Sequence, residues 1–358
     1  IAIYYIHPAG SDTCGNGSKN KPWLSLSNAC SAVTSGSTIH VNPGKYTESK
    51  RCTLSPGVNI EGEGVNSLII SHYVSKDEID ALILLKSSSP GDDGGQSISN
   101  IRLDGDLTGT KAIFGYYRNN VTIRNCTIEN FASVGIAFKN NLTWAEPDYY
   151  AKGNKIENCT IKNCGTLMML YGQSGVTVND NILIENERPG KITHIIRCTW
   201  LTAFKYFNNK SYKPVNNAGK WNFAIELWDS RGGNEVFNNE FPGGGCALDI
   251  AGISNLKGDY NYSWWIHDNK FMLDEPLKLS QTRINTGIAF EATNEDAIVN
   301  NNLFLNLNRA IGISSTRKPD HVKNIRIYHN IFSNIGWKDV GWGYFIYFHS
   351  KLKENYML

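Results

Sequence analysis

Long apolar runs and concentrated charge are both missing from this sequence. None of its apolar stretches approaches the roughly 20 residues that a membrane-spanning helix needs. Charged residues make up only 19% of the 358 residues, the formal net charge is +2, and no basic run stands out. A chain without clustered positive charge gives no electrostatic reason to bind nucleic acid. We therefore expect neither a membrane span nor a nucleic-acid partner.

The eight cysteines form no Cys-x-x-Cys pair, and no histidines stand at a spacing suited to zinc. Common zinc modules are thereby excluded. Cys126 and Cys159 occupy the same position of a repeat described below, which predicts a stack of small buried side chains. A disulfide of Cys14 with Cys30 or Cys52 is expected near the N-terminal end, and it favours an exported protein. We expect a secreted, cell-surface or periplasmic location.

Stretches with the 3.6-residue period of amphipathic helices are scarce. In their place a short phrase recurs: a polar residue, then Asn or Cys, one variable residue and an apolar residue. Its intervals are mostly about 22 to 33 residues, the length of one solenoid coil. The interval between Asp180 and Asn238 is longer and leaves room for an extra coil plus an inserted loop. The phrase occurs at 125–128, 158–161, 180–183, 238–241, 268–271, 301–304 and 329–332.

Alternating apolar residues precede several of these phrases, as at 121–124 and 325–328. Such alternation predicts strands with one buried face. Stacked coils place the same type of residue at the same position of each coil. We therefore expect an interior apolar column and a ladder of hydrogen-bonded asparagines at the turn. Asparagine tolerates the left-handed backbone that such a turn needs. The β-branched, Asn and Gly content disfavours a helical solenoid, and the sequence predicts an all-β, single-stranded parallel β-helix with long loops.

The first part of the chain, residues 1–50, predicts a cap and the first coils. Residues 1–10 are too short for a signal peptide and are expected to form a first strand. Residues 23–33 predict a short amphipathic helix that covers the open end of the core, because terminal repeats must be capped. A strand and turn are expected at 38–46.

This N-terminal part is similar to a known superfamily. From Tyr4 through 10–12, 21–23 and 41–46 it resembles the start of pectate-lyase-like right-handed β-helix proteins. The resemblance implies one right-handed parallel β-helix domain over residues 1–358 and a polysaccharide or oligosaccharide as partner. The superfamily includes polysaccharide lyases, glycoside hydrolases, epimerases and phage tailspikes, so the resemblance specifies the fold and not the reaction. No catalytic motif carries over residue by residue.

Another strand of each coil carries the candidate catalytic residues. In the segment 224–228 the apolar residues face the core, so Glu226 and Trp228 face outward, since strand side chains alternate. The same register turns Asp249 and Glu291 outward. We expect these outward positions to line a substrate-binding face.

Glu226 and Asp249 fall in one outward column on adjacent coils, where strands lie about 4.8 Å apart. Two carboxylates at that separation repel, and one holds its proton above its usual pKa. Glycoside hydrolysis needs such a pair, one carboxylic acid and one carboxylate. Asp229 is expected at the edge of the same patch. We predict Glu226, Asp249 and Asp229 as catalytic residues of a hydrolase that requires no cofactor; a solvated face or a calcium site is the alternative.

Side chains suited to sugar surround these acids. Trp228, Tyr171 and Lys139 are expected in the neighbouring outward column, and exposed aromatic faces stack on sugar rings. Trp221, Trp264 and Trp265 are expected to flank it. The predicted inserted loop, residues 188–222, adds basic residues that suit an acidic sugar. The predicted substrate-binding residues are Trp228, Tyr171, Lys139, His267, Glu291, His194, Arg197 and Arg231.

Two other functions fit the same residues. A polysaccharide lyase acting on a uronic-acid polymer by β-elimination needs a base and a cation that neutralises the acid. Ca²⁺ held by Glu226, Asp229 and Asp249 would supply the cation. A non-catalytic glycan-binding β-helix needs the aromatics without the paired acids. The outward column favours the hydrolase, because it carries acids and aromatics rather than a line of Lys and Arg, and no oligomeric state is predicted. The candidate lyase bases are Lys139, Arg197 and Arg231.

Overall fold

The computed structural model describes residues 2–140, 146–185, 194–212, 223–243, 245–251, 263–273, 285–291, 296–314, 324–336 and 344–348. They fall in two compact units, Ile1–Ile182 (unit 1) and Leu183–Leu358 (unit 2). In the described part of the chain, no helix has the length and apolar character needed to cross a membrane.

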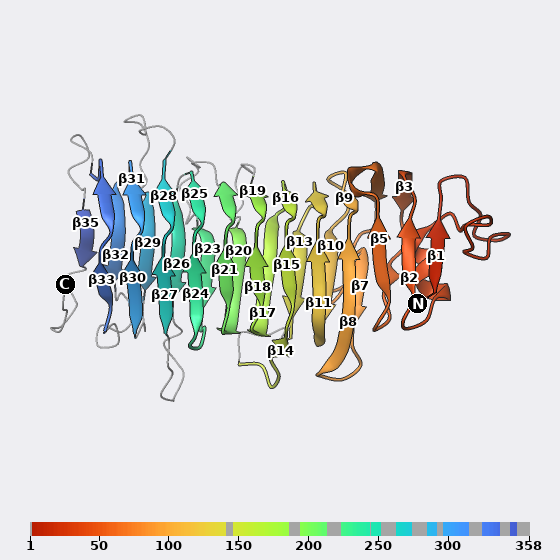
Figure 1. The fold of residues 1–358 in the computed structure, drawn as a ribbon, viewed down its shortest axis with the longest axis horizontal. Helices are drawn as coiled ribbons and strands as arrows, with labels where there is room; N and C mark the ends of the chain where they lie inside the picture. The colour runs from red at the N-terminus through yellow and green to blue at the C-terminus, as the bar shows by residue number, and fades with distance from the viewer. Residues whose placement is uncertain are drawn as a thin grey trace. The chain divides into compact units, whose positions relative to one another are not determined.

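Unit 1 consists of short parallel strands in three sheets, labelled in Figure 1. Sheet 1 contains β1 (Ile3–Ile6), β2 (Thr38–Val41), β5 (Asn59–Gly62), β8 (Asp92–Ser99), β11 (Arg118–Arg124), β15 (Lys155–Glu157) and β18 (Thr177–Asn179). Sheet 2 contains β3 (Gly44–Glu48), β6 (Ser67–Ser71), β9 (Arg102–Asp104), β12 (Thr127–Glu129) and β16 (Thr160–Lys162). Sheet 3 contains β4 (Cys52–Thr53), β7 (Ile83–Lys86), β10 (Lys111–Tyr116), β13 (Val134–Lys139) and β17 (Thr166–Ser174), with β14 (Ala151–Lys152) paired to β17.

Unit 2 repeats this arrangement, and β19 (Ile182–Ile184) spans the division between the units. Its strands of sheet 1 are β21 (Lys205–Phe207), β24 (Asn234–Phe237), β27 (Trp264–His267), β30 (Ala297–Asn300) and β33 (Arg326–Tyr328). Those of sheet 2 are β22 (Lys210–Tyr212), β25 (Glu240–Pro242), β28 (Lys270–Met272), β31 (Leu303–Leu305) and β34 (Ile331–Ser333). Those of sheet 3 are β20 (His194–Thr202), β23 (Phe223–Trp228), β26 (Cys246–Ala251), β29 (Thr286–Glu291), β32 (Arg309–Ser314) and β35 (Tyr344–Phe348).

Within each unit the chain runs through sheets 1, 2 and 3 in turn and then pairs in parallel with the coil before it. The predicted all-β parallel β-helix is therefore confirmed. Its interior is the expected apolar column, because residues at the same register position stack coil upon coil. In sheet 2 of unit 2, the rings of Phe241, Phe271 and Phe304 stack with centroids 5.0 and 4.9 Å apart.

The asparagine ladder is also present. In unit 2 the backbone N–H of Asn239 donates to the side-chain oxygen of Asn269 at 3.0 Å, and Asn269 donates in the same way to Asn302 at 3.0 Å. The left-handed residue is the one before the ladder asparagine: Asn238 and Asp268 each have a φ of 54°. The side-chain amides of the ladder donate to backbone carbonyls and leave few polar groups unsatisfied at the buried turn.

Cys126 and Cys159 take the place of asparagine in two coils of unit 1, which confirms their predicted stack of buried side chains. The thiol of Cys159 donates to the carbonyls of Glu157 at 3.3 Å and Ile123 at 3.7 Å. The amide of Asn239 reaches the carbonyls at the equivalent positions. The thiol thus acts as a weak donor where other coils use an amide.

The predicted cap helix is α1 (Leu26–Ala32), which packs against β1, β2 and β4. Ser25 is its N-cap residue and accepts a hydrogen bond from the backbone N–H of Asn28 at 3.2 Å. The buried carboxylate of Glu48 accepts from the first N–H groups of the helix, those of Leu26 and Ser27. Both caps satisfy donors that an isolated helix end leaves without partners.

The extra coil predicted between Asp180 and Asn238 is present, whereas the predicted inserted loop at 188–222 was wrong for residues 194–212. These residues form β20, β21 and β22, one complete coil with its ladder residue Asn209. The alternating apolar residues of His194–Thr202 pack into the core, so this stretch is regular. Residues 188–193 and 213–222 lie outside the described residues.

Candidate active site

Glu226 and Asp249 are neighbours on sheet 3 of unit 2. Strand β23 pairs in parallel with β26, and the register places Glu226 directly beside Asp249. The flanking residues Ile225 and Leu248 are fully buried in the core, so the two acids lie on the outer side of the sheet. The predicted column of two carboxylates on adjacent coils is confirmed.

Both acids are buried although they lie on the outer side. Glu226 is 6% exposed, Asp249 is 2% exposed and Asp229 is 1% exposed. A freely solvated acidic face, one of the alternatives, was therefore wrong. Burying a carboxylate is costly unless charges or hydrogen bonds compensate it, so a pair of buried acids is a candidate functional site.

Two basic side chains reach Glu226. Arg197 on β20 occupies the register position next to Glu226, and its Nε lies 3.1 Å from Glu226 Oε2. His194 at the start of the same strand places Nε2 at 3.6 Å from that oxygen. An arginine at this distance favours the ionised carboxylate. The charge of Glu226 also affects Cys198. Burial raises the pKa of the Cys198 thiol, and the negative charge of the Glu226 carboxylate raises it further.

Asp229 lies just beyond the end of β23, in the turn that leaves sheet 3. Its φ is 47°, in the left-handed region, and its backbone N–H donates to the carbonyl of Ala251 at 3.2 Å. Trp228 precedes it and pairs in register with Thr199 and Ala251. Arg231 follows in the same turn and donates its backbone N–H to Leu201. Asp229 and Trp228 therefore follow Glu226 at the end of its strand, and the roles of these two residues and of Arg231 stay predictions.

Beyond Asp249 the same column continues with small residues. Ala289 and Gly312 are the register partners on β29 and β32. A Cβ on Gly312 would lie only 3.0 Å from Cδ of Arg309, so the arginine side chain lies over the position where any other residue would carry its side chain. Sequence reasoning missed Arg309. Strict alternation could not have found it, because it places Arg309, two residues before the fully buried Ile311, on the inner face of the sheet.

Tyr171 and Lys139 belong to unit 1, whereas the acids belong to unit 2. The two are register partners on β13 and β17, as predicted, and the ammonium group of Lys139 lies 4.7 Å from the centre of the Tyr171 ring. Lys139 also forms an ion pair with Glu78 and is only 6% exposed. This ion pair gives the lysine a structural role in its own unit, and its role toward substrate stays a prediction.

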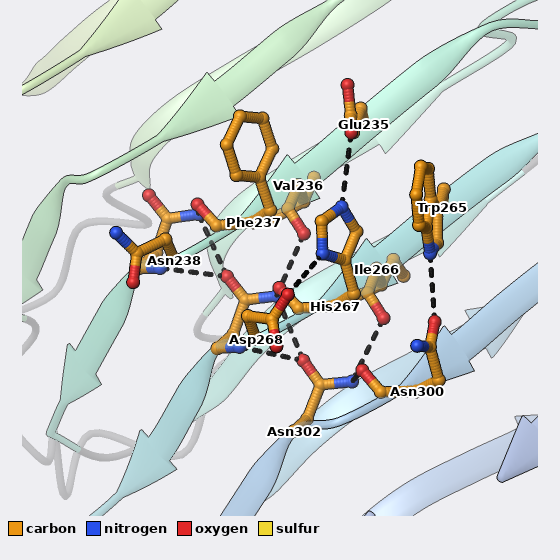
Figure 2. A network of polar contacts seen from close by, with 12 residues as sticks. Glu235, Val236, Phe237, Asn238, Trp265, Ile266, His267, Asp268, Asn300 and Asn302 are labelled. Atoms are coloured by element: carbon orange, nitrogen blue, oxygen red, sulfur yellow. Dashed lines mark hydrogen bonds and ion pairs between the residues drawn. The ribbon is translucent and has the colours of Figure 1, made fainter. Parts of the chain in front are cut away.

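His267 lies on β27, a strand of sheet 1, so its expected place around the acids of sheet 3 was wrong (Figure 2). Its Nε2 lies 3.1 Å from Glu235 and its Nδ1 lies 2.6 Å from Asp268. The ring stacks on Phe237 with a centroid distance of 5.2 Å. The signal was present in the sequence, because His267 directly precedes a ladder phrase and such strands form sheet 1.

Trp264 and Trp265 are on the same strand, in sheet 1 and not in sheet 3, which carries the acids. Trp264 is 2% exposed and faces the core, whereas Trp265 is 46% exposed and donates its indole N–H to Asn300 at 2.8 Å. Trp221 lies outside the described residues. Glu291 pairs in register with Ala251, in the column of Trp228.

A metal site was one alternative for the acids. Within the described ranges, no group of three or more His, Cys, Asp and Glu side chains is arranged to hold a metal ion. The arrangement that the structure does show is a column of one cation and two acids, Arg197, Glu226 and Asp249. A carboxylate held by a cation beside a second carboxyl group is able to carry out acid/base chemistry.

Comparison with known proteins gives one family and several similar structures. The family model described as the right handed beta helix region matches residues 24–262. No curated protein matches the chain. At identities of 10–12%, the structural likeness shows the fold alone.

Three solved structures illustrate this likeness. A complex of XylC with xylose is 10% identical, with 95% of this chain and 76% of that chain covered and a TM-score of 0.63. Alginate lyase from Paenibacillus sp. str. FPU-7 is 12% identical, with 94% and 98% covered and a TM-score of 0.55. DFA-IIIase from Arthrobacter chlorophenolicus A6 without its lid is 11% identical, with 82% and 88% covered and a TM-score of 0.51.

Proposed function

The chain belongs to the right handed beta helix family, and on this premise we propose that it is a secreted glycoside hydrolase acting on a polysaccharide or oligosaccharide. Glu226 and Asp249 are its two catalytic carboxyl groups. The observation that supports this is their register pairing on β23 and β26, with Arg197 bound to one of the two. Glycosidases use two carboxyl groups in different protonation states.

The surroundings of the two acids assign their roles. Arg197 lies 3.1 Å from Glu226, so Glu226 is the ionised carboxylate that acts as base or nucleophile. Asp249 stands one strand away from this negative charge. Like charges at that spacing favour the protonated form of the second group. Asp249 is therefore the acid that protonates the leaving oxygen, and Asp229 and Trp228 border the site.

A sugar as substrate is supported by two further observations. The complex of XylC with xylose shares the fold and contains a sugar. In this chain the outer column passes from the acids to the small residues Ala289 and Gly312, and Arg309 lies across the glycine. The small side chain of Ala289 beside the catalytic pair leaves room for a sugar ring, and Arg309, which covers Gly312, is able to donate several hydrogen bonds to hydroxyl or carboxylate oxygens.

The first test is a screen of the purified protein against neutral and acidic polysaccharides. Reducing ends and the ultraviolet absorbance of an unsaturated uronate are followed together, with and without a chelator. We expect reducing ends without the absorbance, and no effect of the chelator. Absorbance that the chelator abolishes would instead identify a calcium-dependent lyase. If no substrate gives either reducing ends or the absorbance, and glycan binding is measurable, the protein is a binding protein.

Once a substrate is found, azide separates the two roles. Glu226→Ala and Asp249→Ala should each lower kcat by at least about 10²-fold, the usual contribution of general acid–base catalysis. Azide should restore turnover in Glu226→Ala and yield a glycosyl azide of inverted anomeric configuration, because the small anion attacks the substrate directly in place of the missing base or nucleophile. Any glycosyl azide from Asp249→Ala should keep the configuration of the substrate, because there azide attacks a covalent glycosyl-enzyme. The matched control is Glu235→Gln, an acid of sheet 1 bound to Lys205 and His267, which should keep full activity. A glycosyl azide of inverted configuration from Asp249→Ala, and none from Glu226→Ala, would reverse the assignment.

A polysaccharide lyase is the second candidate, and the pairing of Arg197 with Glu226 is the observation that favours it. β-Elimination needs a base and a group that neutralises the uronate carboxylate. The side chain of Arg197 is 30% exposed, so it is able to reach a substrate and to serve in either role. In that case Arg197→Ala would abolish formation of the unsaturated product. A hydrolase would never form that product.

A further inference from the structure

Two buried cysteines of unit 1 lie at the junction of the cap helix and the first coil. Cys30 lies on the buried side of α1 and is 4% exposed. Cys52 opens β4 and is fully buried. Helix α1 packs directly against β4. Two buried cysteines thus lie on the two elements that pack together at the start of the solenoid.

We propose that Cys30 and Cys52 form a disulfide that fastens the cap helix to the first coil when the protein folds in an oxidising compartment. This pairing differs from the expected ones, which joined Cys14 to either residue. Cys14 is exposed and lies in the loop before α1, where its sulfur accepts a hydrogen bond from Thr13. Buried cysteines on two elements that pack directly against each other are the ones that a disulfide can join without moving the backbone far.

The other buried cysteines in contact with each other are less suited to a disulfide. Cys126 and Cys159 donate their thiol protons to backbone carbonyls at 3.2 and 3.3 Å, as members of the ladder. Oxidation would remove both donors and leave buried carbonyls without them. Cys164 is likewise bound to the carbonyl of Lys162 at 3.4 Å. The Cys52 thiol also donates to a backbone carbonyl, that of Lys50, but at a longer distance of 3.9 Å, so in the described part of unit 1 Cys30 and Cys52 are the favoured pair.

The bond forms by thiol–disulfide exchange with a low-molecular-weight disulfide such as oxidised glutathione. One cysteine thiolate attacks a glutathione sulfur, forms a mixed disulfide and releases one glutathione thiolate. The second cysteine thiolate attacks the mixed disulfide and releases the other glutathione. Two protons and two electrons pass from the protein to glutathione, so the reaction is balanced.

The timing of the reaction follows from burial. Burial in the folded chain raises the pKa of the Cys52 thiol well above its ordinary value, and the contact with Cys30 raises it further. Exchange requires the thiolate, so the folded reduced protein should react slowly. We expect the bond to form during folding, before α1 covers β4.

Peptide mapping of the full chain decides whether the bond exists. The reduced, unfolded chain is refolded with oxidised and reduced glutathione, alkylated in denaturant and digested without a reductant. We expect a peptide that joins Cys30 to Cys52, two hydrogens lighter than the sum of its reduced parts. Alkylation of both cysteines, or linkage of either to Cys14, would overturn the proposal.

A stability measurement supplies the second readout. Dithiothreitol should lower the unfolding temperature of the oxidised protein and of the control Cys164→Ser. It should leave that of the double variant Cys30→Ser/Cys52→Ser unchanged. An equal effect of dithiothreitol on the double variant would contradict the proposed bond. Failure of the double variant to fold leaves the peptide map of the unaltered chain as the deciding result, and neither measurement depends on catalytic activity.

Discussion

At the scale of single residues, the ladder shows how one position accepts two chemical groups. The thiol of Cys159 and the amide of Asn239 donate to carbonyls at equivalent places in their coils. The backbone N–H of Cys159 is itself bound to the side-chain oxygen of Asn181 at 2.9 Å. What the position requires is a small buried side chain with a donor.

This requirement leads to a prediction for Cys159. Cys159→Asn should fold and should match or exceed the wild-type stability, because an amide is a better donor than a thiol. Cys159→Val keeps the volume but removes the donor, which should cost about 1–3 kcal/mol for the buried carbonyls. Urea unfolding of the three proteins measures the difference. Equal stability of the Val and Asn variants would show that packing alone matters at this position.

Arg197 is the second residue whose effect is open to test. Its guanidinium favours the ionised form of Glu226, so removing it should raise the pKa of that carboxyl group. Because the base must be ionised, Arg197→Gln should move the acid limb of the kcat profile to higher pH and lower kcat on the order of 10-fold or more. Lys205→Gln, which breaks an ion pair of sheet 1, is the control. An unchanged pH profile would remove Arg197 from the mechanism.

At the scale of elements, the cap helix depends on one buried acid. Burial raises the pKa of Glu48 above its ordinary value of 4.5, although hydrogen bonds from Ser27 and Leu26 oppose the shift. A group with a raised folded-state pKa binds more protons in the folded than in the unfolded chain. Its contribution to the free energy of unfolding therefore falls as the pH rises from its ordinary pKa through the raised one.

We accordingly predict different pH profiles of stability for Glu48 variants. Glu48→Gln keeps an oxygen for the two N–H groups of α1 but has no charge to bury. Relative to wild type it should gain stability as the pH rises above about 4.5. Glu48→Ala removes the acceptor and should cost about 1 kcal/mol, as for a lost helix cap. Urea unfolding between pH 4 and 8, with the exposed Glu61→Gln as control, tests both statements.

At the scale of the whole molecule, a solenoid is stabilised by contacts between neighbouring coils. Asn269 exemplifies this in unit 2, because it is bonded to Asn239 in the coil before it and to Asn302 in the coil after it. Stability in such a fold is close to a sum of terms from each coil and its neighbours. Damage at one ladder position should therefore remain local.

Hydrogen exchange measures this locality. Asn269→Ala should lower the protection of amides in β24, β27 and β30, which belong to its own and the adjacent coils. The amides of β2 and β5 in unit 1 should keep their protection. A uniform loss over all strands would show that the chain unfolds as one cooperative whole and would contradict the coil-by-coil picture.

The sequence by itself determined the architecture and the central pair of the site. A phrase that recurs at coil length implies stacked strands, and alternation separates inward from outward residues. The adjacency of Glu226 and Asp249 follows from these two facts, because each occupies the same position of consecutive repeats. Wherever the repeat is regular, local periodicity is sufficient to predict which residues lie side by side on adjacent coils.

Only the tertiary structure decided the rest. The contact of His194 and Arg197 with Glu226 depends on strand β20. This strand belongs to a coil without a recognisable repeat phrase, in the long interval between Asp180 and Asn238. The burial of the acids depends on which groups cover the outer side, and alternation carries no information about that. The meeting of Cys30 with Cys52 depends on how a helix docks against a strand. Each of these is a long-range contact, whose partner is set by packing in three dimensions and not by any local period of the chain.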